Sequence, residues 1–215
     1  MNSFARRFAH TARIARTMLA TMQSLLNTQP RPVYARAPSA HFIHRTYASD
    51  AGFTNPSALA RQAHDAMSLG TFALTQGNAE QAQTHLEHAL QLHPTSDAHY
   101  NMGMCQYMLK NIDLAIEHWK KSMQMDPSSP DAYVSLGNAY FLSKNESETA
   151  IEYMQKALEL APNDPEIQFN LACMRESEGS IDQAIDLYTK AASNGLERAQ
   201  PFLRNAMAKR VKQNI

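Results

Sequence analysis

The sequence predicts an all-α protein whose body is a solenoid of stacked helix pairs. The first observation is a period of about thirty-four residues that recurs in four units between residues 63 and 196. The second is that small residues fall at matching places in every unit. The third is that a proline closes each of the first three units, at Pro94, Pro127 and Pro162, where it stops a helix and forces the chain to turn.

The matching columns have a physical reason. A first column of small residues holds Gly70, Gly103, Gly137 and Ala172. A second holds Ala82, Ala115, Ala150 and Ala184. Small residues at both places let the two helices of a pair cross closely. A third column, one turn later, holds the large residues Leu86, Trp119, Met154 and Tyr188. We interpret these as core residues that fill the gap, so Trp119 should pack beside Gly103 and Ala115.

These columns resemble the tetratricopeptide repeat, most closely in Tyr100-Asn101-Met102-Gly103 and in Ala157-Leu158-Glu159-Leu160-Ala161-Pro162. The resemblance covers residues 63–196. It implies a right-handed α-solenoid of four helix-turn-helix repeats that binds other proteins. The third unit is one residue longer than expected, and we place the extra residue in the polar turn 144–148.

The sequence also predicts the structure of the segments on either side of the repeats. Residues 48–62 form a linker and the start of the first helix, where Asn55-Pro56 gives the favourable order of cap and proline. Residues 197–215 are basic, and Phe202, Leu203, Ala206 and Met207 recur at helical spacing. We expect a C-terminal helix that caps the last repeat, with a basic tail able to contact an anionic membrane surface.

Residues 1–47 have the composition of a mitochondrial targeting presequence, with seven arginines and no Asp or Glu. Apolar residues at steps of three and four define one face of a helix: Phe4, Phe8, Ala12, Ala15, Leu19, Met22 and Leu26. Arg6, Arg13 and Arg16 share another face. The run Arg45-Thr46-Tyr47-Ala48-Ser49 resembles a mitochondrial processing signal, so we expect a mature chain that begins at Ala48. A retained basic arm or membrane-surface anchor is the alternative.

Catalytic and metal-binding motifs are not apparent in the sequence. There is no nucleotide-binding loop, no nucleophile elbow and no Walker-type glycine run. Of the histidines, His85, His88 and His93 are the only cluster worth considering, and no carboxylate or thiol is spaced to complete a metal site. Cys105 and Cys173 are too far apart for a CxxC motif and are interpreted as reduced, buried thiols. We expect no enzyme activity and no cofactor.

The resemblance also implies a binding surface, because in this family the first helix of each repeat lines a concave groove through its second, fifth, sixth, ninth and twelfth positions. The candidate groove residues are Met67, Tyr100, Asn101, Met104, Tyr107, Val134, Asn138, Phe141, Phe169 and Asn170. The second positions give an acidic rim of Asp97, Asp131 and Glu166. Some family members grip a C-terminal carboxylate with basic residues, but Asp131 and Ser135 stand where those cations would be needed. An apolar, amide-bearing groove predicts an extended or helical protein segment as partner.

Net charge differs sharply along the chain. Residues 48–196 hold nineteen acidic and eight basic residues, a net charge of −11, which opposes nucleic-acid binding through the repeats. No stretch reaches the roughly eighteen apolar residues that a transmembrane helix needs. The leading hypothesis is a non-catalytic adaptor in the mitochondrial matrix, or on the matrix face of the inner membrane, that helps a larger complex to assemble. The alternative is a cytosol-facing import receptor or co-chaperone anchored by residues 1–47.

Overall fold

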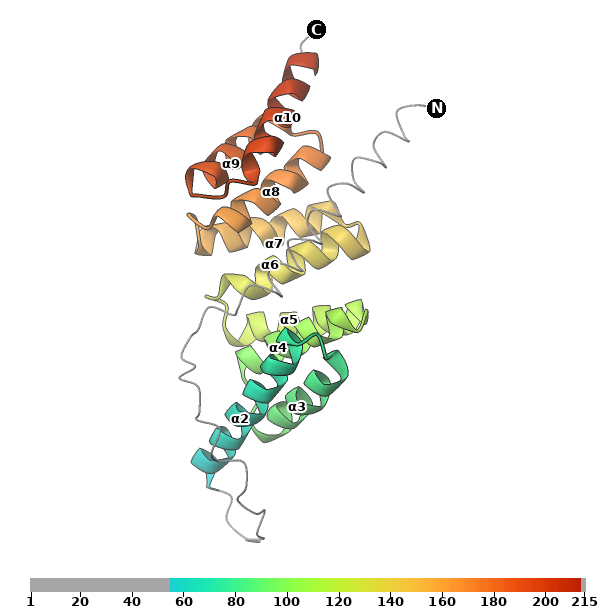
Figure 1. Cartoon of the computed structure of the whole chain (residues 1–215), viewed down its shortest axis with the longest axis vertical. Helices are drawn as coiled ribbons and strands as arrows, with labels where there is room; N and C mark the ends of the chain where they lie inside the picture. The colour runs from blue at the N-terminus through green and yellow to red at the C-terminus, as the bar shows by residue number, and fades with distance from the viewer. Residues whose placement is uncertain (1–54, 214–215) are drawn as a thin grey trace.

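The computed structural model describes residues 55–213, and within this range every regular element is helical (Figure 1). The α-helices are α2 (Pro56–Thr75), α3 (Ala79–Leu92), α4 (Ser96–Met108), α5 (Ile112–Met125), α6 (Pro130–Ala139), α7 (Ser147–Leu160), α8 (Pro165–Ser177), α9 (Ile181–Ser193) and α10 (Ala199–Gln213). Each helix packs chiefly on its neighbours in the chain. The pairs stack along the long axis, with α2 and α3 at one end and α10 at the other. The predicted all-α solenoid is confirmed.

Small and large residues meet within each helix pair. A Cβ added at Gly70 would lie 2.6 Å from Cγ of Leu86, and one added at Gly137 would lie 3.1 Å from Cε of Met154. Leu86, Met154 and the equivalent Trp119 and Tyr188 are all fully buried. The glycine and large-residue columns therefore face each other, as the sequence predicts.

Local sequence signals set where the helices begin and end. Side-chain oxygens of Asn55, Thr95 and Asp164 accept hydrogen bonds from backbone N–H groups in the first turns of α2, α4 and α8. Proline follows the first residue after α3, α5 and α7, at Pro94, Pro127 and Pro162, and so prevents these helices from continuing. The chain is thereby divided into units with the spacing that stacking requires.

The extra residue of the third unit is absorbed within the helix and not in the following turn, which corrects our placement of it at residues 144–148. After α6 the chain continues as a π-helical turn, η1 (Tyr140–Lys144), and then reaches the left-handed residue Asn145. In the other repeats the first helix is followed by a left-handed residue one place earlier, at Gly77, Lys110 and Gly179. A π-helical turn holds one more residue than an α-helical turn, so it accommodates the insertion.

The C-terminal helix α10 stands where the first helix of a fifth repeat would stand. Its Ala206 falls in the column of Gly70 and Gly103 and is fully buried. Phe202 packs edge-on against Phe169 of α8, with ring centroids 5.0 Å apart. The expected capping helix is therefore present and covers the last helix pair.

Two further expectations concern the targeting segment and membrane-spanning helices. The proposed targeting segment, residues 1–47, lies outside the described residues. Between residues 55 and 213, no helix is both long and apolar enough to span a membrane.

Candidate functional site

The candidate site is the surface formed by the second, fifth, sixth, ninth and twelfth positions of the first helix of each repeat. We call it the first-helix face. Tyr100, Asn101, Met104 and Tyr107 come from α4, and Val134 and Asn138 come from α6. Met67 lies on α2, Phe141 on η1, and Phe169 and Asn170 on α8. Equivalent positions on consecutive first helices thus place these residues in one series along the stack.

The candidate residues differ in how deeply they lie. Half-buried side chains come mainly from the second and third repeats: Met67, Tyr100, Asn101, Met104 and Val134. Buried side chains are Tyr107, Asn138, Phe141, Phe169 and Asn170. None of the ten is fully exposed, so the face is built of partly covered apolar and amide groups.

Tyr100 shows that the face continues from α4 to α6. The pKa of Tyr100 is raised to about 12, chiefly by burial and also by the nearby charge of Asp131, while a hydrogen bond with Ser135 opposes the shift. Asp131 and Ser135 belong to the next repeat. The phenol is therefore neutral at physiological pH, and its ring links two repeats on the first-helix face.

Buried amides are the least ordinary feature of this face. Asn138 is 2% exposed and Asn170 is 1% exposed. Oδ1 of Asn138 and both Oδ1 and Nδ2 of Asn170 are buried without a hydrogen-bond partner. Buried polar atoms are nearly always paired, because an unpaired one costs about 1 to 3 kcal/mol. An N–H group of a segment laid against α6 could supply the donor that Oδ1 of Asn138 lacks.

The fourth repeat is covered by the chain's own C-terminal helix. Phe169 is fully buried, with the Arg198 guanidinium 5.1 Å from its ring centroid and Phe202 against its edge. Arg198 also forms an ion pair with Glu166, which is one of the expected acidic rim residues. In this structure Phe169 therefore contacts α10 and its preceding turn, and does not stand open to a partner.

A buried polar cluster joins α8, α9 and α10, and the repeat pattern did not indicate it. The Tyr188 hydroxyl donates to Oε2 of Glu176 at 2.8 Å and lies 3.3 Å from Sγ of Cys173. Nζ of Lys209 lies 2.5 Å from Oε1 of Glu176. Burial raises the pKa of Tyr188 and raises that of the Cys173 thiol to about 12, so both groups stay protonated. The cluster holds the last helices together and leaves Cys173 unreactive.

Two histidines also meet without a sequence signal. Nδ1 of His99 on α4 lies 3.0 Å from Nδ1 of His118 on α5, and the ring centroids are 5.3 Å apart. Burial lowers the pKa of both rings, to about 4 for His118, with His99 and Lys121 adding to the shift there. The three histidines considered from sequence, His85, His88 and His93, lie elsewhere. Within residues 55–213, His, Cys, Asp and Glu form no group of three or more suited to a metal ion.

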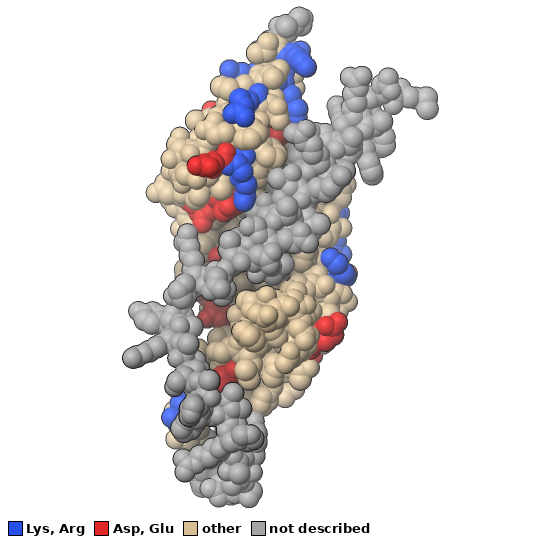
Figure 2. Space-filling model, viewed as in Figure 1, with Lys and Arg blue, Asp and Glu red and all other residues tan. Residues whose placement is uncertain are grey.

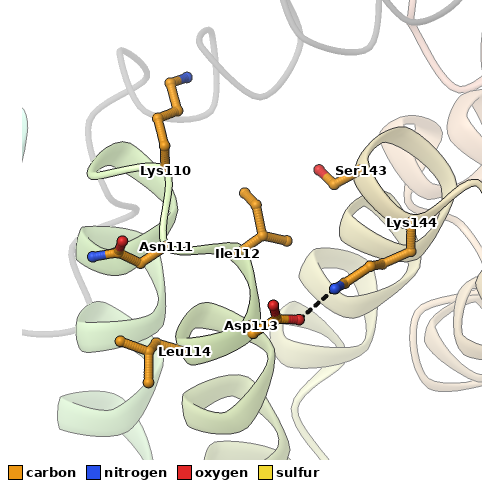
Figure 3. Close-up of a pocket in the computed structure, with 7 residues that line it drawn as sticks. All are labelled: Lys110, Asn111, Ile112, Asp113, Leu114, Ser143 and Lys144. Atoms are coloured by element: carbon orange, nitrogen blue, oxygen red, sulfur yellow. Dashed lines mark hydrogen bonds and ion pairs between the residues drawn. The ribbon is translucent and has the colours of Figure 1, made fainter.

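A pocket of about 470 Å³ lies between the second and third repeats (Figure 3). Its lining comes from the turn 110–114 and from Ser143 and Lys144. Lys144 forms an ion pair with Asp113, while the Lys110 side chain points away from that pair. The carboxylate of Asp113 in this lining is thus engaged with a lysine.

Comparison with known proteins supports the repeat assignment. Tetratricopeptide-repeat family models match residues 96–129 and residues 130–164. No curated protein matches the chain. Among solved structures, a crystal structure of MamA is similar with a TM-score of 0.58 and 23% identity, over 64% of this chain and 81% of that one. A second MamA crystal structure gives a TM-score of 0.57 and 24% identity, over 72% and 94% of the two chains.

A third similar structure is MamA, residues 41 to the end, from Desulfovibrio magneticus RS-1, with a TM-score of 0.55 and 27% identity over 68% of this chain and 77% of that one. These similarities agree with the fold of stacked helix pairs. The family models match α4 to α7 directly, and the same residue columns continue into α2, α3, α8 and α9. Residues 96–164 are tetratricopeptide repeats, within a longer stack of the same construction.

Proposed function

We propose that this chain is a non-catalytic adaptor that binds a segment of another protein along its first-helix face and helps a mitochondrial complex to assemble. Tetratricopeptide repeats imply protein partners. The observation that carries the proposal is the buried, unpartnered Oδ1 of Asn138, on a face that also holds the half-buried side chains of Tyr100, Met104 and Val134.

The binding chemistry follows from these side chains. An amide can donate to a carbonyl and accept from an N–H group of a partner's backbone, which fixes the position of the segment but not its sequence. Tyr100, Met104 and Val134 offer half-buried apolar surface for the partner's side chains. Methionine adapts its shape easily, so the face can accept side chains of different form.

The test is binding of a partner found by proximity labelling and co-purification. In the face variant, Asn101→Ala is combined with Asn138→Ala. We expect affinity to fall at least about thirtyfold, since buried contacts at interface centres commonly contribute about 2 kcal/mol or more. The oxygen that the Asn138 substitution removes has no hydrogen-bond partner, so its loss breaks no hydrogen bond within the chain.

The matched control changes exposed residues on the second helices, Glu117→Gln with Glu152→Gln, and should leave affinity within about threefold. Circular dichroism must show that both variants are folded. If the face variant binds normally and the control does not, the partner binds the second helices and the proposal is wrong.

Mitochondrial location is supported by the acid-free, amphipathic composition of residues 1–47. We propose that these residues are removed to give a chain that begins at Ala48. Mass spectrometry of the protein isolated from its own mitochondria should find that N-terminus, or one within a residue or two of it. An intact N-terminus, together with protease sensitivity on intact organelles, would instead indicate an anchored protein facing the cytosol.

A further inference from the structure

The first-helix face carries charge of one sign. Its positions in the four repeats include the carboxylates of Asp97, Asp131, Glu166 and Glu176, and no lysine or arginine. Asp97 on α4 and Asp131 on α6 are exposed and lie at equivalent places in neighbouring repeats. A face of this kind attracts cationic segments and disfavours acidic ones.

Over the fourth repeat, this face is already covered by another part of the chain, and the contacts there show which chemistry it binds. Over the fourth repeat, Arg198 pairs with Glu166 and lies over Phe169, Phe202 packs against Phe169, and Lys209 pairs with Glu176. The covering element is helical, basic and aromatic. In Figure 2 the Lys and Arg side chains gather over α10, at the end of the molecule where this contact is made.

A second segment of the chain shares this chemistry. Residues 4–26 combine Phe4 and Phe8 with Arg6, Arg13 and Arg16, and residues 1–47 contain no acid. The segment lies outside the described residues and joins the stack at Asn55, beside the first helix. As a helix it would extend for roughly 35 Å, and the connection from residue 27 to residue 54 can extend for up to about 90 Å. Both lengths suffice to reach α4 and α6 from α2.

We propose that residues 4–26, while still attached, bind to the first-helix face over α4 and α6, with arginines beside Asp97 and Asp131. This inference rests on the proposed function, because it concerns the same face.

The experiment uses the full chain with a photo-crosslinking phenylalanine derivative, p-benzoylphenylalanine, in place of Phe8. Peptide mapping should find the crosslinks within residues 97–104 of α4 and 131–138 of α6. The variant Asp97→Asn with Asp131→Asn should lower the crosslink yield about threefold to tenfold, and added salt should lower it as well. The matched control, Glu117→Gln with Glu152→Gln, should leave the yield unchanged.

Two outcomes would overturn the inference. One is crosslinks on the second helices or on Leu69 and Phe72, the exposed apolar residues of α2. The other is mixed isotopic composition in crosslinked products from a mixture of nitrogen-15-labelled and unlabelled chains, because this would mean that a second copy supplies the segment. Neither outcome bears on the co-purified partner, whose binding to the face variant is measured separately. Failure of this inference can therefore be told from failure of the proposed function.

Discussion

The indole ring of Trp119 occupies the space that a side chain at Gly103 would need. A Cβ added at Gly103 would lie 2.5 Å from both Cδ1 and Nε1 of Trp119. The ring is fully buried and rigid, and Tyr107 lies against it with ring centroids 5.8 Å apart. The helix crossing of the second repeat therefore leaves no room for a side chain at residue 103.

The first prediction follows from this contact. Gly103→Ala should lower the free energy of unfolding by about 1 to 3 kcal/mol in urea denaturation, because overpacking outweighs the gain of about 1 kcal/mol in helix propensity. Gly137→Ala is the matched control, since its Cβ would lie 3.1 Å from both the Ala150 carbonyl oxygen and the flexible tip of Met154, against 2.5 Å at Gly103. Its loss should be smaller. Equal losses for the two variants would show that the indole ring does not limit the space.

The second prediction concerns Lys110, which adopts a left-handed backbone conformation with a φ of 67°. Residues other than glycine are strained there, and the first and fourth repeats have Gly77 and Gly179 at the same place. Lys110→Gly should raise the free energy of unfolding by about 0.5 to 1 kcal/mol. The reverse change, Gly179→Lys, should lower it by a similar amount. A loss of stability in Lys110→Gly would mean that the lysine side chain makes a contact worth more than the strain.

The third prediction concerns the buried cluster of Tyr188, Glu176 and Lys209. Tyr188→Phe removes the hydroxyl that donates to Glu176, so a buried carboxylate loses a hydrogen bond. Unfolding in urea should show a loss of about 1.5 to 3 kcal/mol. Tyr153→Phe, at a half-buried tyrosine stacked on Tyr140, should change stability by less than about 0.5 kcal/mol. The idea fails if the two substitutions have the same effect.

The fourth prediction is a loss of stability in mild acid. The folded protein lowers the pKa of His118 from 6.5 to about 4, so the unfolded chain takes up the proton first as pH falls. The contribution of neutral His118 to the free energy of unfolding is therefore fully present above pH 6.5. It is lost as the pH falls from 6.5 to about 4. Because the pair is only partly buried, we expect a loss of about 1 to 2 kcal/mol.

The measurement is the urea midpoint at pH 7.5 and at pH 5.0. His118→Gln should remove much of the difference between the two midpoints, whereas His88→Gln, at an exposed residue of α3, should preserve it. An unchanged difference in His118→Gln would assign the acid sensitivity to other groups. His99, whose pKa burial also lowers, is the neighbour that such a result would implicate.

Much of the fold could be predicted because its determinants are periodic. Gly70, Gly103 and Gly137 mark helix crossings, and Pro94, Pro127 and Pro162 mark the ends of units. These features depend only on how closely two helix backbones can approach and on where a helix ends. Single residues decide both locally. The exact turn geometry depends on more than one residue. The extra residue of the third repeat could be placed in a loop or in η1, and only the structure distinguishes them.

The candidate site could be predicted less completely. Position in a repeat shows which way a side chain faces, but it does not show which other segment covers that side chain. Phe169 and Glu166 are covered by Arg198 and Phe202, about thirty residues further along the chain. The pairing of His99 with His118 likewise depends on rotamers at a helix crossing, which no spacing rule encodes.

Exposed apolar residues at the α2 end of the stack show that these column positions are buried only where a preceding repeat packs on them. Leu69 is 53% exposed, whereas its equivalents Met102, Leu136 and Leu171 are at most 3% exposed. Phe72 is 64% exposed, and its equivalents Cys105, Ala139 and Met174 are at 0%. In α4, α6 and α8 these positions pack on the preceding repeat, which α2 lacks among the described residues. The two ends of the rod are thus chemically unlike, and lengthening it by duplication at the α2 end would need no new interface, only another copy of one already present.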